Sequence, residues 1–252
     1  MIEFQHVSKT FVQNGHQLDV LKDLSFTVHQ GEFVAVLGPS GCGKTTLLSI
    51  AAGLIRPTNG KILLFGQEIT KPNPRMTVIF QDIALLPWKT ALKNVEFALK
   101  GVMGFENRRV RRERALELIR FVGLEGFENC YPYQLSGGMK QRVGIARALA
   151  FDPDCILMDE PFGALDALLR EELHVQVQNL FQHVNKTILL VSHDIHEALV
   201  LADRMILMTP RPGRVKAEFE VNLPRPRSAA LYTTSEFRQL MESVRNAMKA
   251  SP

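Results

Sequence analysis

The stretch GPSGCGKT, from Gly38 to Thr45, decides the fold class of this chain. It fits the phosphate-loop pattern G-x-x-x-x-G-K-[ST], whose backbone N–H groups point at phosphates while the lysine reaches the terminal phosphates and the hydroxyl binds Mg²⁺. The loop follows the apolar run EFVAVLG at 32–38 and opens a helical pattern at 45–53, the context that supports the motif. The residues expected to bind the nucleotide here are Gly38, Pro39, Ser40, Gly41, Cys42, Gly43, Lys44, Thr45 and Thr46.

A second glycine-containing segment, LSGGMKQR at 135–142, lies far downstream of the phosphate loop. Ser136, Gly137 and Gly138 precede an apolar helical pattern and form a second cradle of phosphate size. In one compact chain, the two cradles cannot easily contact the same nucleotide. The economical arrangement is two copies placed head to tail, with each nucleotide between the loop of one copy and the cradle of the other.

The remaining pattern predicts an α/β fold. CILMD at 155–159 and TILLVS at 187–192 are short aliphatic runs followed by turns and helical patterns, which is typical of buried parallel strands. RMILMT at 204–209 favours a further strand. The opening alternates like antiparallel strands, with Asn14-Gly15 as the turn. We expect a P-loop NTPase core with a parallel sheet, an N-terminal antiparallel β layer, and a helical lobe inserted at about 90–150.

Four further side chains are expected to carry chemistry. Asp159 ends an apolar strand, where a carboxylate is costly unless it faces a cation, most simply the Mg²⁺ on ATP. Glu160 follows at once and is suited to act as general base for the attacking water. His193, just past TILLVS, favours a contact to the γ-phosphate region. Gln81 follows the apolar run VIF, and either coordinates Mg²⁺, orients water or simply ends a strand.

Composition and net charge limit the classes of partner that we expect this chain to bind. A net charge of +4 and a pI near 9.0 fit a nucleic-acid partner, an anionic membrane face or neither. The basic cluster RRVRRER at 108–114 merges into a helical pattern, which favours a solvated helix face, so we expect no nucleic acid. No apolar run reaches the ~18 residues of a membrane helix, and no export signal is evident. We therefore expect a cytoplasmic chain with reduced cysteines and no zinc site.

Taken together, GPSGCGKTT, Gln81, LSGGMKQR, ILMDEP at 156–161, ALD at 164–166 and His193 occur in the order and spacing of ABC transporter ATP-binding subunits. The chain resembles this family over roughly residues 2–222, and we expect residues 1–222 to form the ATPase domain. Residues 223–252 are expected to form a short extension that ends in an amphipathic helix. The resemblance implies that Phe11 stacks on adenine, Asp166 links two ATP sites, and Gln81 senses the membrane subunits. It further implies that Ser136 to Gly138 close on the ATP of the partner copy.

A narrower resemblance rests on FQDIALLPWKT at 80–90, PFGALDALLR at 161–170, and the PRPGR and LPRPR segments at 210–214 and 223–227. These segments are similar to those of nitrate, sulfonate and taurine importer ATPases. The resemblance implies a dimer beneath two permease subunits at the cytoplasmic face of the inner membrane, supplied with a small anion by an extracytoplasmic binding protein. Two alternatives remain, a soluble ABC ATPase of translation or DNA repair and an exporter ATPase.

Overall fold

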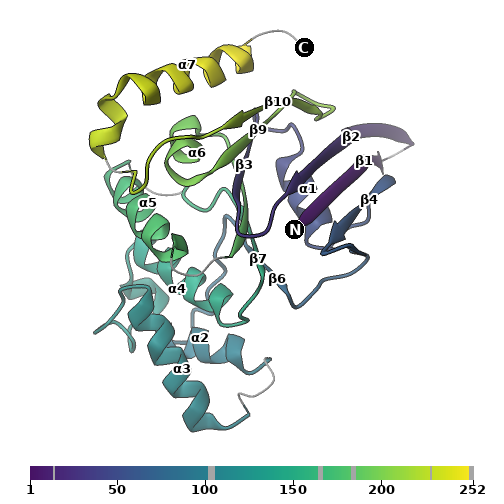
Figure 1. The fold of residues 1–252 in the computed structure, drawn as a ribbon. Helices are drawn as coiled ribbons and strands as arrows, with labels where there is room; N and C mark the ends of the chain where they lie inside the picture. Colours follow the sequence, from purple (N-terminus) through teal and green to yellow (C-terminus); the bar gives the residue numbers. More distant parts are fainter. Residues whose placement is uncertain (14, 102–105, 164–166, 183–185, 228, 250–252) are drawn as a thin grey trace.

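The computed structural model describes residues 1–13, 15–101, 106–163, 167–182, 186–227 and 229–249, and contains two sheets (Figure 1). The aliphatic runs form the larger sheet, in which all neighbouring strands are parallel except the antiparallel edge strand β10. Its strands, in spatial order, are β10 (Val215–Glu220), β9 (Arg204–Met208), β3 (Phe33–Leu37), β8 (Thr187–Ser192), β7 (Cys155–Asp159) and β6 (Met76–Ile79). The predicted parallel core is confirmed.

The second sheet is antiparallel and holds the N-terminus, as predicted. Gly15, with a φ of 77°, lies at the turn between the two long strands, whereas Asn14 is outside the described residues. The spatial order is β2 (His16–Val28), β1 (Ile2–Gln13), β4 (Asn59–Leu64) and β5 (Gln67–Glu68). Strands β4 and β5 were not predicted, because NGKILL at 59–64 is too short and too polar at its start to show a clear alternation.

Helix α1 (Lys44–Ala51) lies between the two sheets, and the alternation of side chains on β3 explains why. Val34 and Val36 pack with Leu47 of α1 and with the antiparallel sheet, whereas Phe33 and Ala35 face the opposite core. That second core is covered by the remaining helices. The parallel sheet is therefore buried on both faces, and the loop between β3 and α1 is held at its carboxyl edge.

The predicted helical lobe extends from one end of the parallel sheet (Figure 1). Its α-helices are α2 (Ala91–Leu99), α3 (Arg108–Phe121) and α4 (Gly137–Leu149), with a short 3₁₀ helix, η1 (Pro132–Gln134), before α4. The arginines of α3 are exposed or half-buried while Ala115 and Ile119 are buried, so the basic cluster is a solvated helix face as expected. In the part of the chain that the structure describes, no helix is long and apolar enough to span a bilayer.

The core helices α5 (Ala167–Gln182) and α6 (Ile195–Leu201) are followed at the C-terminus by η2 (Ala229–Thr233) and the predicted amphipathic helix α7 (Ser235–Lys249). Phe237 and Val244 of α7 are buried against the core. His196 of α6 lies with its ring 4.2 Å from that of Tyr232 and 5.5 Å from that of Phe237, centroid to centroid. The C-terminal segment thus packs directly on α6, and the boundary at residue 222 stays a prediction.

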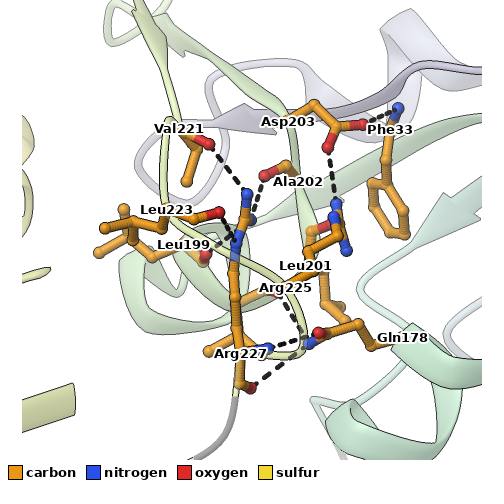
Figure 2. A network of polar contacts seen from close by, with 11 residues as sticks. Phe33, Gln178, Leu199, Leu201, Ala202, Asp203, Val221, Leu223, Arg225 and Arg227 are labelled. Carbon is orange, nitrogen blue, oxygen red and sulfur yellow. Dashed lines mark hydrogen bonds and ion pairs between the residues drawn. The ribbon is translucent and has the colours of Figure 1, made fainter. Parts of the chain in front are cut away.

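The LPRPR segment between β10 and η2 is tied into the same region by Arg227 (Figure 2). This side chain is 2% exposed, and its guanidinium donates hydrogen bonds to backbone carbonyls of the α6 end and of the segment itself. The accepting carbonyls belong to Leu199, Ala202, Val221 and Leu223. Gln178 of α5 completes the arrangement, because its amide oxygen accepts from the Arg227 N–H and its amide nitrogen donates to the Val200 carbonyl.

Candidate active site

The phosphate loop joins β3 to α1 and depends on glycine where it enters the helix. Gly43 is the N-cap of α1 with a φ of 108°, and a Cβ there would lie 2.6 Å from Cδ2 of Leu21. Another residue at position 43 would therefore be strained and would also collide with β2. Since the first N–H groups of a helix have no intrahelical partner, this turn leaves donors at the start of α1 that suit a phosphate.

Lys44 is held under this loop rather than in solvent. Its side chain is 5% exposed, and Nζ donates to the carbonyl oxygens of Gly38 at 2.8 Å and Pro39 at 3.3 Å. The same ammonium lies 3.6 Å from Oε1 of Glu160. The loop thus fixes one buried cation beside the carboxylate that the sequence predicted as a general base.

Thr45 and Asp159 meet beside Lys44, although they lie far apart in the sequence. The Thr45 hydroxyl donates to Oδ1 of Asp159 at 3.2 Å. Burial raises the pKa of the Asp159 carboxyl, and the Thr45 hydrogen bond opposes this shift. A buried carboxylate and a hydroxyl at this spacing fit Mg²⁺, which binds through one or two protein oxygens together with phosphate oxygens. The described residues hold no group of three histidine, cysteine or acidic side chains suited to a metal, so phosphate and water oxygens would complete the set.

Glu160 turns sharply out of β7 and pairs with His193. Its φ is 43°, a left-handed conformation that a non-glycine residue rarely adopts and that is found mainly at functional sites. Its N–H donates to the Val191 carbonyl at 3.0 Å, which holds this turn against β8. Oε2 lies 3.0 Å from Nδ1 of His193, which follows β8. The ends of two adjacent strands therefore bring these two side chains together.

These residues surround a cavity of about 370 Å³ over the phosphate loop. Phe11 of β1 lines it with a partly exposed ring, so the cavity extends from the antiparallel sheet to the end of β7. The lining residues are Phe11, Leu18, Val20, Ser40, Gly41, Gly43, Lys44, Thr45, Thr46, Glu160 and Arg211. Asp159 and His193 reach the cavity through their contacts with Thr45 and Glu160. The arrangement suits a ligand that carries phosphates at one end and a flat ring at the other.

Comparison with known proteins agrees with this geometry. The sequence model described as ABC transporter matches residues 21–163. The chain belongs to this family. As a member of the ABC transporter family it is an ATPase, and ATP is the nucleotide that it binds.

Relatives of this ABC ATPase resemble it over most of its length. It is 50% identical over 210 residues to the taurine import ATP-binding protein of Pelagibacter ubique, spanning 83% of this chain and 78% of that one. It is 41% identical over 245 residues to the aliphatic sulfonates import ATP-binding protein of Bacillus cereus, spanning 96% and 94%. The chain also superposes on a solved ATP-binding cassette with a TM-score of 0.76 at 35% identity, covering 89% of this chain and 100% of that one. That cassette is described as a dimer in a post-hydrolysis state with ADP and phosphate.

The second cradle of this ABC ATPase lies apart from the cavity. Ser136 is exposed as the N-cap of α4, where its side chain accepts from the Met139 N–H at 3.3 Å. Gly137 is exposed and Gly138 is buried, both within the first turn of α4. No residue of the 135–142 segment is among those that line the phosphate cavity, within the chain as described. One copy does not bring the two cradles together.

The structure describes Gln81 but not Asp166. Gln81 lines a separate cavity of about 440 Å³ with Pro161 and Gly137, and the structure records no contact between it and the Thr45–Asp159 pair. Its predicted roles toward Mg²⁺ and water therefore stay predictions. Asp166 lies outside the described residues, as does the whole of ALD at 164–166.

Two parts of the site were missed by sequence reasoning. Arg211 lines the cavity, but PRPGR showed only a proline-rich connector at the level of sequence. Glu197 of α6 is 4% exposed beneath the His193 turn, where its Oε2 is hydrogen-bonded to the Ser192 hydroxyl. Burial raises the pKa of Glu197 to about 8. Neither side chain carries a sequence signal, because each is defined by neighbours from other segments.

Proposed function

We propose that two copies of this ABC ATPase form composite ATP sites and that their hydrolysis of ATP energises the import of a small anion through two permease subunits. The observation that carries the proposal is the division of the site. Lys44, Thr45 and Glu160 line one cavity, and Asp159 and His193 contact Thr45 and Glu160 beside it. The Ser136 cradle lies elsewhere on the same chain. A second copy would supply the missing cradle.

Each side chain at the cavity has a role in this proposal. The loop N–H groups and Lys44 hold the phosphates, and the face of Phe11 stacks on adenine. Thr45 and Asp159 would hold Mg²⁺, which would neutralise charge on the phosphates. Glu160 accepts a proton from a water molecule while the oxygen of that water attacks the γ-phosphorus. The bond between the γ-phosphorus and the β,γ-bridging oxygen breaks, which releases ADP and phosphate. His193 orients the Glu160 carboxylate through the contact between Nδ1 and Oε2.

The partner copy completes this site with Ser136, Gly137 and Gly138 at the start of α4. The exposed positions of Ser136 and Gly137 fit that role, because a cradle wholly buried in its own chain could not reach a second one. The likeness to a cassette that was solved as a dimer supports the arrangement. Asp166, by its resemblance to the family pattern, would link the two sites.

The permease subunits would dock at an apolar groove between β6 and the helical lobe. This groove, about 540 Å³ in volume, is lined by the exposed rings of Phe80, Phe97 and Phe151, and Trp88 is 70% exposed in the turn beside it. Residues 82–84 line both this groove and the Gln81 cavity, so a ligand in the groove would contact the segment that carries Gln81. This continuity supports Gln81 as a sensor of the membrane subunits.

The names of the relatives support the solute class. Taurine and aliphatic sulfonates are small organic anions, so we infer a sulfonate, nitrate or similar anion as the transported solute. An extracytoplasmic binding protein would deliver it. The ATPase itself would be a peripheral subunit at the cytoplasmic face of the inner membrane.

A complementation experiment tests this function. A strain lacking the gene should grow poorly when taurine or another sulfonate is the sole sulfur source, or nitrate the sole nitrogen source, and the wild-type gene should restore growth. Trp88→Ala should fail to restore full growth and should be lost from permease-containing membranes, while the purified subunit keeps its ATPase rate. A defect confined to sugar or peptide uptake would contradict the solute class. Equal loss of ATPase activity and membrane association would contradict the docking role of Trp88.

A further inference from the structure

The loop between β9 and β10, which carries PRPGR, is a closed and well-anchored turn that the proposed mechanism does not use. The Thr209 N–H donates to the Arg214 carbonyl at 3.0 Å, and the Arg214 N–H donates back to the Thr209 hydroxyl at 3.0 Å. The same hydroxyl donates to the Pro212 carbonyl at 3.1 Å. The backbone of this loop therefore holds Arg211 in a defined place.

The loop is also fixed against the phosphate loop and β2. The Gly213 N–H donates to the Val20 carbonyl at 2.9 Å, and the Lys22 N–H donates to the Gly213 carbonyl at 2.9 Å. A Cβ at Gly213 would collide with the carbonyl oxygen of Cys42, so only glycine permits so close an approach. The β9–β10 loop, β2 and the phosphate loop thus form one packed unit.

Arg211 extends from this unit along the phosphate loop. Its Nε and Nη2 donate to the Gly41 carbonyl at 3.1 and 3.0 Å, and its side chain lines the same cavity as Lys44 and Phe11. Among the described residues no carboxylate lies within ion-pair distance of Arg211, whereas Lys44 faces Glu160. A guanidinium has five N–H donors, so those not bonded to Gly41 remain for a ligand.

We propose that Arg211 is a second cationic contact of the ATP polyphosphate, supplied by the β9–β10 loop. The chemistry favours phosphate, because a guanidinium oriented by a carbonyl presents further N–H groups in a plane that matches phosphate oxygens. Lys44 alone supplies one buried cation, and its charge is shared with Glu160. Arg211 adds a cation that no described acidic side chain offsets. The proposal rests on ATP binding at this cavity.

Equilibrium binding of MgADP to the purified full chain tests this contact without the dimerisation that ATP would drive. Arg211→Gln should raise the Kd about tenfold or more, the range expected for a hydrogen bond to a charged group, and Arg211→Lys should recover part of the loss. The effect should shrink as salt is raised, since the side chain is exposed. Arg214→Gln is the matched control, because Arg214 is exposed in the same loop but does not line the cavity; its Kd should stay within about twofold of wild type.

The outcomes separate the possible failures. If Lys44→Ala abolishes binding while Arg211→Gln binds MgADP as wild type does, Arg211 is not a ligand contact and the ATP site stands. If Arg211→Lys loses as much affinity as Arg211→Gln, and salt does not change that loss, Arg211 only braces the Gly41 carbonyl. If Lys44→Ala binds normally, the cavity itself is not the nucleotide site and both proposals fall.

Discussion

Three ionisable side chains at or near this site are removed from water by the fold, and each is stabilised differently. Lys44 and Asp159 are 5% and 6% exposed and contact Glu160 and Thr45 respectively. Glu197 is as deeply buried but has no cation bonded to it; within the described chain its Oε1 has no hydrogen-bond partner. Its carboxyl is therefore held in the neutral form by its surroundings.

The burial of Glu197 predicts a stability that falls as pH rises. Burial is the main cause that raises the pKa of Glu197 from 4.5 to about 8. The charges of Asp194 and Glu160 add to this shift, whereas the Ser192 hydrogen bond and the charge of Arg170 oppose it. Between these two pKa values the folded chain keeps a proton that the unfolded chain releases, so the free energy of unfolding falls as pH increases. The loss from this group is at most about 1.4 kcal/mol per pH unit.

Urea unfolding from about pH 5 to about pH 8 checks this prediction. The free energy of unfolding of Glu197→Gln, which is permanently neutral, should decline less steeply with pH than that of the wild type. The buried imidazole of His174 does not account for a difference in pH dependence between the wild type and Glu197→Gln. Burial lowers the pKa of its imidazole to about 4, so its effect has the opposite sign, and it is present in both proteins. Parallel pH dependences would show that Glu197 is ionised in the folded chain.

Among the secondary-structure elements, the short helix α6 is fastened at both ends. Asp194 caps its start, where its side chain accepts from the N–H groups of His196 and Glu197. At the other end of α6, two arginines of the LPRPR segment donate to backbone carbonyls (Figure 2). Arg227 donates to those of Leu199 and Ala202, and Arg225 donates to that of Leu201 at 2.8 Å. His193 immediately precedes the Asp194 cap at the start of α6, and the C-terminal segment holds the opposite end of the same helix.

Arg227→Met should destabilise the chain by about 3 kcal/mol or more, because buried carbonyls would lose their donors and burial would leave them unsatisfied. The guanidinium has carbonyl partners only, and burial lowers its pKa to about 10. The measurement is urea unfolding with Arg238→Met, on the exposed face of α7, as the control. The control should change stability by less than about 0.5 kcal/mol. Equal stability of the two variants would mean that the Arg227 network contributes nothing to the fold.

Elements with a strong local pattern were predictable, whereas elements defined by partners were not. The aliphatic runs of β3, β7 and β8 reveal their burial in sequence, and the phosphate loop carries its own geometry. Strand β10, VKAEFE at 215–220, is a mostly half-buried edge strand of mixed polarity and shows no such run. The pairing of Arg227 with Gln178 joins residues 49 positions apart, and nothing local in either segment indicates it.

For the molecule as a whole, the central feature is that the phosphate-loop cavity and the start of α4 at Ser136 lie in separate regions of the chain. Of the residues that line the phosphate cavity, the sequence predicted those in local motifs, such as Lys44, Thr45 and Glu160, but not Arg211. That the two cradles need two copies stays a prediction. The structure adds that His193 contacts Glu160 and that Gln81 lies in a separate cavity. Such contacts depend on how β7, β8 and α4 are placed around the sheet, which no single segment encodes.

Analytical size-exclusion chromatography of Glu160 and Ser136 variants tests the head-to-tail site most directly. Loss of a general base typically lowers a rate by ~10² to 10⁴, while binding through Lys44 and the loop should survive. Glu160→Gln should therefore accumulate an ATP-bound dimer. Ser136→Arg puts bulk and charge into the cradle, so the Glu160→Gln, Ser136→Arg double variant should bind ATP and remain monomeric. A double variant that still forms a stable ATP-bound dimer would contradict the composite site, as would Glu160→Gln hydrolysing ATP at the wild-type rate.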